Sequence, residues 1–351
     1  MRRVAFIAGL FTLLCVGLLA VVFGIGSPPQ KLASAGPRIE ATLTVTWETN
    51  GPARQITFSH DGSMLATSDV SGRISIRHVS SWRELAELHH DGGATSIAFS
   101  PDGSKLFSGG YDGQVRIWNT QRHSQIGQLN GGQRTLWALD LSPDGTQLAA
   151  AGEDGLVRIW RLDNPTAPLV LRGHELNIWG VRYSPDGKLL ASSSFDKTAR
   201  IWDSKTGKIV RIIRGHEQAV VGVAFGPDGR TLATCSDDST IRLWRISDGK
   251  PLRTIDAGNH TYKVDFSPDG QWLASGGRAR SGIGTAWHQL TGLGGAAAPV
   301  RIWRMVDGAL AATLPANDDV PEVRFSPDQR WLATSGEDNR VRIWRLRSTS
   351  S

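Results

Sequence analysis

The sequence is poor in the residues and motifs that mark disulfide-bonded, metal-dependent or catalytic proteins. It has only two cysteines, Cys15 and Cys235, among 351 residues, so a framework of disulfides does not hold the fold together. It contains no HExxH, CxxC, GxSxG or P-loop motif, which are the usual signatures of catalytic, metal and nucleotide sites. We therefore expect no enzyme activity, no metal and no cofactor.

Charge is also moderate. Charged residues make up 21% of the chain and hydrophobic residues 40%, which excludes a disordered polymer and fits a folded globular protein. The net charge of +6 is mildly basic, and such a balance affects solubility and non-specific association rather than fold. The 40 glycines predict many tight turns.

The hydrophobic residues are spread unevenly, and the longest apolar run covers residues 4–25. These 22 residues carry no charge, and a helix of this length spans a hydrocarbon core of about 30 Å. The core of a secretory signal peptide is shorter, about 7–15 residues, so we interpret 4–25 as an uncleaved transmembrane signal anchor. The alternative is cleavage near residues 33–35 (Ala-Ser-Ala), which would leave a soluble exported protein.

The flanks of this run predict its orientation. Residues 1–3 form a short basic flank with two arginines, and the positive-inside rule places that end in the cytoplasm. The charge difference is small because Lys31 and Arg38 follow the run, so insertion the other way, with a cytoplasmic-facing domain, is the alternative. Residues 26–40 contain two adjacent prolines and are predicted to be a linker.

Beyond residue 40 a turn motif recurs seven times: SHDG begins at 59, SPDG at 100, 142, 184 and 267, GPDG at 226 and SPDQ at 326. Consecutive motifs lie 41 or 42 residues apart, except for the last pair, which lies 59 apart. A leucine follows each motif start by six residues, and in five repeats a tryptophan follows that leucine by twelve. Such a period indicates a repeat architecture built from one supersecondary unit.

Local chemistry predicts the structure of one unit. In Pro-Asp-Gly, proline presets φ, aspartate bonds the nearby backbone and glycine accepts a positive φ, which together make a tight turn. The turn joins alternating segments such as VGVAF and TLATCS, and two further alternating segments follow in each period, so each unit has four antiparallel strands. Packing of successive sheets face to face, with closure into a ring, would bury both faces of every sheet.

The combination of GH, SPDG, LAS, D and RIW at intervals of 41–42 residues resembles the WD-repeat β-propeller family over about residues 41–347. The resemblance implies an all-β, seven-bladed propeller of four-stranded antiparallel blades, preceded here by the N-terminal transmembrane helix. It also implies a buried hydrogen-bonded network within a blade. The matching residues are His174, Ser194, Asp196 and Trp202 in blade four, and His216, Ser236, Asp238 and Trp244 in blade five.

Two blades depart from this pattern. Blade one has Ser71 and Arg77 in the positions of Asp and Trp, and blade two has no Gly-His, although His89 and His90 lie near. The last copy ends at residue 346 without a fourth strand, whereas ATLTVTW (41–47) precedes the first inner strand. We therefore expect 41–47 to supply the outer strand of the last blade and 348–351 to form a tail.

Arginine stands two residues before the tryptophan in six repeats, at Arg116, Arg158, Arg200, Arg242, Arg301 and Arg342. One interpretation is a basic belt for nucleic acid or anionic lipid. We favour the simpler one, a solvated strand position repeated with the unit, and we expect no nucleic acid partner because the domain is predicted to be exported.

Members of the WD-repeat family usually bind partners on the face where the inner strands begin and the second-to-third turns lie. Five residues before each turn motif stand Arg54, Thr95, Trp137, Trp179, Val221, Tyr262 and Pro321, and Tyr111, Glu153, Phe195, Asp237 and Glu337 stand just before each turn aspartate. The aromatic ones, Tyr111, Trp137, Trp179, Phe195 and Tyr262, are expected around the channel mouth, where aromatic anchors suit a binding hot spot. The alternative is that some of them pack against the neighbouring blade.

Residues 276–299 (GGRARSGIGTAWHQLTGLGGAAAP) break the period. Leu273 and Trp303 lie 30 residues apart where other repeats need 12, so 18 extra residues lie between the second and third strands of blade six, on the same face. The two glycines at 282 and 284 lack the βαβ context of a nucleotide loop. A tolerated surface insertion and a binding loop are both open, and the contacts of a binding loop would be Trp287, His288, Arg278 and Arg280.

These observations favour a non-catalytic interaction scaffold. It would be a single-pass membrane protein whose propeller lies outside the cytoplasm, on the periplasmic or extracellular side, and binds protein or peptide partners on the face that carries the insertion. The alternative is an enzyme or small-ligand propeller with its site at the channel mouth, where the carboxylates of Glu153 and Glu337 offer thin support for chemistry.

Overall fold

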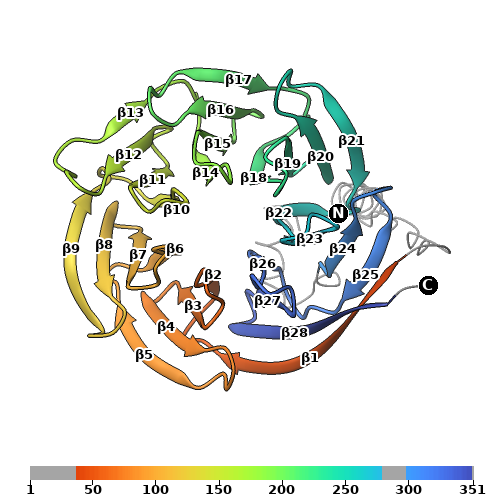
Figure 1. Ribbon diagram of the computed structural model, residues 1–351, viewed down its shortest axis with the longest axis horizontal. Coiled ribbons are helices and arrows are strands. Elements are labelled where there is room, and N and C mark those ends of the chain that lie inside the picture. The colour runs from red at the N-terminus through yellow and green to blue at the C-terminus, as the bar shows by residue number, and fades with distance from the viewer. Residues whose placement is uncertain (1–36, 279–297, 350–351) are drawn as a thin grey trace, which may run out of the picture. The chain divides into compact units, whose positions relative to one another are not determined.

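The computed structural model describes residues 37–278 and 298–349. These residues form seven four-stranded antiparallel sheets, which stand as blades around a central axis (Figure 1). The predicted all-β, seven-bladed propeller is therefore confirmed. No helix of the described residues has the length and apolar character needed to cross a membrane. The predicted flank 1–3, the anchor 4–25 and residues 26–36 of the linker lie outside the described residues.

Each of the first three blades takes four consecutive strands, ordered from the axis to the rim. Blade 1 contains β2 (Ala53–Phe58), β3 (Met64–Asp69), β4 (Arg73–His78) and β5 (Glu84–His89). Blade 2 contains β6 (Ala94–Phe99), β7 (Lys105–Gly110), β8 (Gln114–Asn119) and β9 (Ser124–Asn130). Blade 3 contains β10 (Leu136–Leu141), β11 (Gln147–Gly152), β12 (Val157–Arg161) and β13 (Leu169–Leu171).

The remaining blades follow the same order, and only the last takes its outer strand from the other end of the chain. Blade 4 contains β14 (Ile178–Tyr183), β15 (Leu189–Ser194), β16 (Ala199–Asp203) and β17 (Ile209–Ile213). Blade 5 contains β18 (Val220–Phe225), β19 (Thr231–Ser236), β20 (Thr240–Arg245) and β21 (Pro251–Asp256). Blade 6 contains β22 (His260–Phe266), β23 (Trp272–Arg278), β24 (Val300–Arg304) and β25 (Leu310–Leu314), and blade 7 contains β26 (Val323–Phe325), β27 (Trp331–Ser335), β28 (Arg340–Thr349) and β1 (Arg38–Glu48).

The turn motif joins the first and second strands of a blade as its chemistry predicts. In blade 4, Asp186 Oδ1 accepts the hydroxyl of Ser184 at 2.7 Å and the backbone N–H of Lys188 at 3.1 Å. Gly187 has a φ of 71°, a left-handed value that glycine adopts without steric cost. The hydroxyl of Ser184 in turn accepts the N–H of Leu189 at 2.9 Å, so one side chain caps both sides of the turn.

Ring closure follows the predicted scheme, with longer strands. β1 pairs antiparallel with β28 from Arg38 opposite Thr349 to Glu48 opposite Arg340, with one irregularity after Leu43. The strand therefore includes 41–47 but begins inside the predicted linker, and β28 runs into the predicted tail. The outer strand of the last blade thus comes from the start of the domain, and the sheet joins both of its ends.

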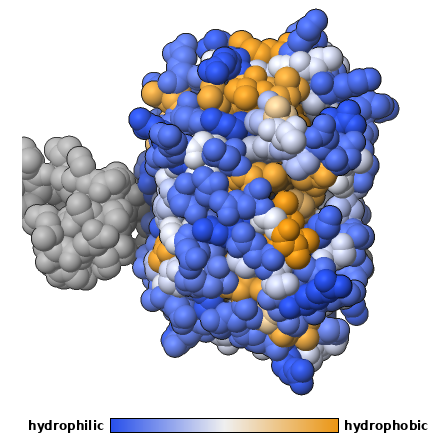
Figure 2. All heavy atoms as spheres, turned by 90° about the vertical axis from the view of Figure 1, so that its left-hand side faces the viewer, coloured by the Kyte–Doolittle hydropathy of each residue, from blue (hydrophilic) through white to orange (hydrophobic). Residues whose placement is uncertain are grey.

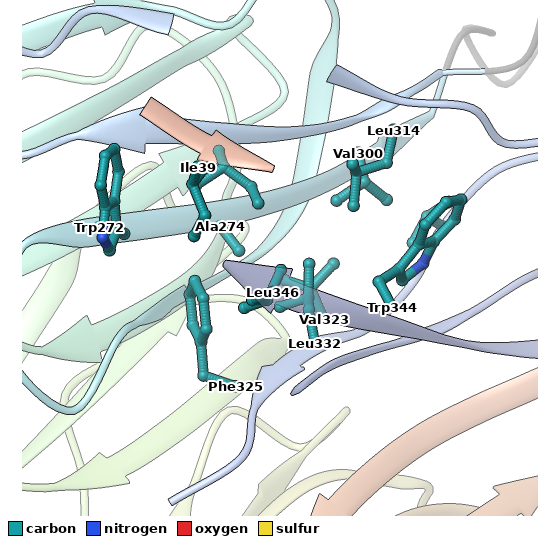
Figure 3. Close-up of a cluster of buried hydrophobic side chains, with 12 residues drawn as sticks. Ile39, Trp272, Ala274, Val300, Leu314, Val323, Phe325, Leu332, Trp344 and Leu346 are labelled. Carbon is teal, nitrogen blue, oxygen red and sulfur yellow. The ribbon is translucent and has the colours of Figure 1, made fainter. Parts of the chain in front are cut away.

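Hydrophobic cores fill the spaces between neighbouring blades. Figure 3 shows the core between blades 6 and 7, where Trp272 and Val300 of blade 6 face Phe325 and Trp344 of blade 7. Ile39 of β1 joins this core and is 6% exposed. The closing strand is therefore held by burial of apolar surface as well as by its backbone pairing.

Side chains of the inner strands also tie one blade to the next. In each link a polar side chain accepts a backbone N–H from the inner strand of the following blade. The pairs are Gln55 with Ile97 (3.0 Å), Ser96 with Leu139 (2.8 Å), Asp140 with Tyr183 (2.7 Å) and Asp265 with Phe325 (2.8 Å). These links set the spacing of the strands around the channel.

The outer rim is mixed in character. Seen from the side that carries β9 and β13, hydrophobic residues form separate patches among hydrophilic ones (Figure 2). Exposed aliphatic residues of the outer strands include Ile126, Leu169, Ile209 and Leu252, which are 38–49% exposed. Such scattered exposure is ordinary for a folded protein.

Candidate partner-binding face at the channel mouth

A buried network ties together the inner and outer halves of blade 4. His174 Nε2 lies 2.7 Å from the hydroxyl of Ser192, and the indole N–H of Trp202 donates to the same hydroxyl at 2.8 Å. His174 Nδ1 lies 2.7 Å from a carboxylate oxygen of Asp196. Blade 5 repeats the arrangement with His216, Thr234, Asp238 and Trp244.

The hydroxyls in these networks belong to Ser192 and Thr234, which corrects the expectation of Ser194 and Ser236. Side chains two residues apart on a strand point to the same face, so each pair of hydroxyls shares the correct face. Ser194 stands at the end of β15, where it accepts the N–H of Asp196 and donates to the carbonyl of Leu176. The indole N–H of Trp202 therefore donates to Ser192, the hydroxyl nearer the middle of the strand.

Blade 2 has a complete network that sequence reasoning missed. His90 Nδ1 lies 2.7 Å from Ser108 Oγ, its Nε2 lies 3.2 Å from Asp112, and Trp118 Nε1 donates to Ser108 at 2.8 Å. His89 in place of the usual glycine hid the match. The signal was present, because the histidine precedes the aspartate by 22 residues in blades 2, 4 and 5 alike.

The six recurring arginines are largely buried, so the expectation of a solvated strand position is wrong. Five of them pair with the turn aspartate four residues earlier: Arg116 with Asp112, Arg158 with Asp154, Arg200 with Asp196, Arg242 with Asp238 and Arg342 with Asp338. Their side chains are only 8–22% exposed. Arg301 donates to the side-chain oxygen of Asn259 instead. These guanidinium groups are therefore engaged within their own blades.

These networks are saturated and structural. Burial lowers the pKa of His90 and of His174. Burial alone would raise the pKa of Asp196, but hydrogen bonds from His174 and Thr198 hold it below its usual range. Each of these imidazoles has both ring nitrogens engaged, so none is free to move a proton to or from a substrate.

A β-bulge explains which side chains reach the channel mouth. The pairing of the first and second strands shifts by one residue in blades 1 to 6. The residues at these shifts are Arg54, Thr95, Trp137, Trp179, Val221 and Tyr262. A bulge re-aims the side chain of the extra residue. The same positions were selected by their spacing from the turn motif, and the bulge is the physical reason why that spacing matters.

Four aromatic residues from blades 2, 3 and 4 form a continuous ladder, which we call the aromatic ladder. The ring of Tyr111 meets that of Trp137 edge to face at 5.7 Å and 88°. Trp137 stacks on Trp179 at 4.7 Å and 7°, and Trp179 stacks on Phe195 at 5.3 Å and 13°. All four side chains are partly exposed. Trp179 thus stacks with a ring from blade 3 and with a ring of its own blade, so the four rings form one connected row.

The other side of the mouth is charged. Arg54 of blade 1 pairs with Glu337 of blade 7 at 2.6 Å, and Arg278 of blade 6 pairs with Asp237 of blade 5 at 2.9 Å. The guanidinium of Arg278 also lies 5.3 Å from the ring centre of Tyr262. Burial together with Asp319 and Asp318 raises the pKa of Glu337 against the opposing effect of Arg54. Tyr262 therefore belongs to a charged arc, apart from the aromatic ladder.

Of the predicted loop contacts, the structure describes only Arg278, the last residue of β23. Arg280, Trp287 and His288 lie outside the described residues. β24 begins at Val300, so the extra residues do connect the second and third strands of blade 6. The chain enters this connection at Arg278, beside Tyr262.

A small cavity of about 70 Å³ lies at the centre of the mouth. Its lining comes from blades 1, 2, 3, 4, 6 and 7, so it sits on the ring axis: Arg54, Gln55, Thr95, Trp137, Trp179, Tyr262, Lys263, Pro321 and Glu322. Lys263 and Glu322 were not predicted as site residues. They directly follow Tyr262 and Pro321, which were predicted from their spacing to the turn motif. The same spacing holds for Ala138 in blade 3 and Gly180 in blade 4, so it does not distinguish the charged residues from the small ones.

Burial governs the ionisation of both groups. It lowers the pKa of Lys263 and raises the pKa of Glu322. Below them Asp265 accepts a backbone N–H and lies 3.2 Å from a guanidinium nitrogen of Arg324. Burial raises the pKa of Asp265 to about 7. In the described part of the chain, no group of three or more His, Cys, Asp or Glu side chains has the geometry of a metal site.

Comparison with known protein families identifies the repeat. The family model for the WD domain, G-beta repeat, matches six segments, 82–119, 123–161, 166–203, 207–245, 249–281 and 308–345, which together make up more than half of the chain. The segments leave out β2, β3 and β4 of blade 1, where Arg77 replaces the tryptophan. A search of curated proteins gives no match.

Proposed function

This chain belongs to the WD40 repeat family, and we propose that it is a non-catalytic interaction scaffold that binds a protein partner at the channel mouth. WD40 propellers generally serve as platforms for protein partners. The observation that carries the proposal for this chain is the aromatic ladder of Tyr111, Trp137, Trp179 and Phe195.

The ladder has the properties of a binding hot spot. Each ring is held by at least one neighbour at 4.7–5.7 Å, so little rotamer freedom is left to lose on binding. Aromatic side chains dominate interface hot spots because they bury a large apolar area at small entropic cost. A pre-formed, partly exposed row of four rings at the mouth of a propeller therefore favours contact with a protein surface.

We propose further that residues 4–25 anchor the protein in a membrane and that the propeller lies on the non-cytoplasmic side. The apolar run without charge and the basic residues before it support this. Protease treatment of cells tests it once any outer barrier has been removed. A propeller outside the cytoplasm is then digested, whereas a cytoplasmic one stays intact until the cells are opened.

The insertion is proposed to extend the same face. Its first described residue, Arg278, contacts Tyr262 and Asp237 at the mouth, so the added chain starts beside the cavity. Arg280, Trp287 and His288 are the proposed additional contacts. Removal of 279–297 is expected to reduce the set of captured partners, whereas an unchanged set would mean that the insertion is passive.

A crosslinking capture experiment on the full chain in membranes tests the scaffold role. Alanine at Tyr111, Trp137, Trp179 and Phe195 is expected to remove the captured partners while the melting curve still shows a folded propeller. The matched control replaces four exposed apolar residues of the rim, Ile126, Leu169, Ile209 and Leu252, and is expected to capture partners normally. Equal capture by both quadruple variants would contradict the proposed site.

A further inference from the structure

The cavity at the mouth is lined by an amine and a carboxyl group that do not form an ion pair, those of Lys263 and Glu322. Lys263 Nζ donates to the backbone carbonyl of Trp179 at 3.3 Å, and within the described part of the chain no carboxylate oxygen lies within 4.0 Å of it. Glu322 is 1% exposed. Its Oε1 lies 3.2 Å from Arg324, but its Oε2 is buried without a hydrogen-bond partner among the described residues.

The repeat shows why a gap exists here. Lys263, Glu322 and Gln55 follow directly after the mouth positions of blades 6, 7 and 1. At the same place blades 2 to 5 have the short side chains of Ser96, Ala138, Gly180 and Gly222. Three long polar side chains therefore share the axis with four short ones, and the cavity lies between them.

The size and the polarity of the cavity define what can enter. An apolar cavity of roughly 150 Å³ binds one benzene molecule, so a cavity of about 70 Å³ has room for the end of one side chain or of a chain. The basic side chains of the lining are Arg54 and Lys263, and its one acid is Glu322. Arg54 pairs with Glu337 through one guanidinium nitrogen, but its Nε is buried without a hydrogen-bond partner in the described structure. The indole N–H groups of Trp137 and Trp179 are also buried without partners in the described structure. Donors thus outnumber acceptors around the space.

We propose that this cavity receives one carboxylate of the partner, either its C-terminal carboxylate or an aspartate or glutamate side chain. Lys263 and Arg54 donate to it, and Glu322 in its neutral form donates Oε2–H to the second oxygen. This inference rests on the proposed partner site and names the chemistry that the ring axis recognises there. A neutral Glu322 is favoured by its burial, and the bound carboxylate supplies the acceptor that its Oε2 lacks.

The experiment uses the full chain in detergent micelles with its 13 tryptophans replaced by 5-fluorotryptophan. The fluorine resonances of Trp137 and Trp179 are assigned with Trp137→Phe and Trp179→Phe, and they are followed during titration with small probes. N-acetylalanine offers only a C-terminal carboxylate, and N-acetylglutamate α-amide offers only a side-chain carboxylate. N-acetylglutamine amide and N-acetylarginine amide are the neutral and cationic counterparts.

One or both carboxylate probes are expected to shift the two resonances saturably, and which of them binds identifies the source. The glutamine amide is expected to bind at least about ten-fold more weakly, because charge-assisted hydrogen bonds are roughly twice as strong as neutral ones. Equal binding of the glutamine amide, or preferential binding of the arginine amide, would overturn the carboxylate assignment.

Variants separate the site from general effects. Lys263→Met is expected to abolish the shift, whereas Lys250→Met, at an exposed lysine before β21, leaves it unchanged. If Lys263→Met does not fold, Glu322→Gln serves in its place. This variant keeps a neutral donor and is expected to bind the carboxylate probes, and loss of binding would contradict the assigned role.

The two proposals can fail separately. If partner capture depends on the aromatic ladder but carboxylate probes do not bind, the scaffold role stands and the carboxylate inference fails. If the probes bind but partner capture does not depend on the aromatic ladder, the carboxylate inference stands and the proposed partner site is wrong.

Discussion

Trp137 and Trp179 stand at equivalent bulges of neighbouring inner strands, and their rings lie parallel with centres 4.7 Å apart. Each side chain is therefore placed by its own strand but oriented by the adjacent blade. The contact joins blades 3 and 4 at the mouth, and it makes the aromatic ladder a single rigid surface instead of four separate anchors.

This contact predicts an energetic coupling between the two tryptophans. In a double-mutant cycle with Trp137→Leu and Trp179→Leu, the coupling free energy of unfolding is expected to be about 0.5–1.5 kcal/mol, the usual value for an aromatic pair. Urea denaturation of the full chain in detergent measures it. Effects that add within roughly 0.3–0.5 kcal/mol would show that the stacked pair contributes nothing to stability.

Ring closure by β1 predicts a large loss of stability on its removal. Replacing residues 38–48 by a Gly-Ser segment of equal length removes ten backbone-paired positions with β28, and each net hydrogen bond contributes about 1 kcal/mol. The melting temperature is expected to fall by about 10 °C or more, since roughly 1 kcal/mol moves it by 2–4 °C in a domain of some 200 residues. The single change Leu43→Ser, at an exposed position of the same strand, should leave it nearly unchanged. A melting curve unaffected by the replacement would rule out this closure.

The fold was accessible from the sequence because every blade repeats the same local instructions. The turn motif, the leucine and the tryptophan recur at a fixed spacing, so the number of blades, the strand order and the closing strand follow from counting. Ser192 and Ser194 show where such counting ends. Both face the same side of β15, and the choice between them depends on how far along the strand the tryptophan reaches, which no spacing encodes.

The site was partly accessible for the same reason. The residues at the bulges share one register, so their gathering at the mouth could be predicted. The stacking of Trp137 on Trp179 could not, because it depends on the angle between two blades. The roles of Lys263 and Glu322 could not be predicted from their spacing. They depend on the short side chains at the same place in four other blades, which leave a cavity beside these two residues.

Buried neutral histidines predict how stability depends on pH. Burial lowers the pKa of His90 and of His174 below the usual 6.5, so the unfolded chain binds protons that the folded chain resists. The contribution of these two histidines to the free energy of unfolding is therefore fully present above pH 6.5, and it is lost as the pH falls below that value. A variant with His90→Gln and His174→Gln should be less stable at pH 8 but show a shallower decline between pH 7 and pH 5. Parallel declines of the two proteins would mean that other groups control the acid limb.

The turn between β4 and β5 contains a strained tryptophan. Trp82 has a φ of 57°, while Gly207, Gly249 and Gly308 stand at the same place in blades 4 to 6. Its ring lies 5.2 Å from that of Trp331 and 6.5 Å from that of Trp47, across the seam where the ring closes. Packing thus offsets a left-handed backbone that costs roughly 1–2 kcal/mol.

Two glycine substitutions separate strain from packing at this turn. Trp82→Gly relieves the strain but loses the aromatic contacts. It is expected to destabilise the protein by about 1–4 kcal/mol, since truncating a well-packed tryptophan costs roughly 3–5 kcal/mol and the relieved strain offsets about 1–2 kcal/mol of that. His123→Gly, at the same turn position of blade 2 with φ of 53° and an exposed side chain, loses no core contact and is expected to be neutral or up to about 1 kcal/mol more stable. Chemical denaturation of both variants gives the comparison. A stabilised Trp82→Gly variant would show that the three tryptophans do not hold the seam.

Carboxylate binding at the ring axis predicts a pH dependence with a defined sign. Burial raises the pKa of Glu322 and lowers the pKa of Lys263, so lower pH favours both the neutral acid and the charged amine that the bound carboxylate needs. Glu322 also interacts electrostatically with Asp265 of the neighbouring blade 6 and with Arg182 of blade 4, and Arg324 contacts it.

Asp265 titrates near pH 7 because burial raises its pKa to about that value, and its neutral form adds to the positive potential beneath the cavity. The affinity for N-acetylglutamate α-amide or N-acetylalanine is therefore expected to rise as the pH falls from 8 to 6, while these probes stay ionised. Glu322→Gln, which fixes the neutral donor, should bind the probe more tightly than the wild type at pH 8 and show a weaker pH dependence. Asp265→Asn should flatten the part of the curve near pH 7. An affinity that falls with decreasing pH would mean that the acid, and not the cations, selects what enters the ring.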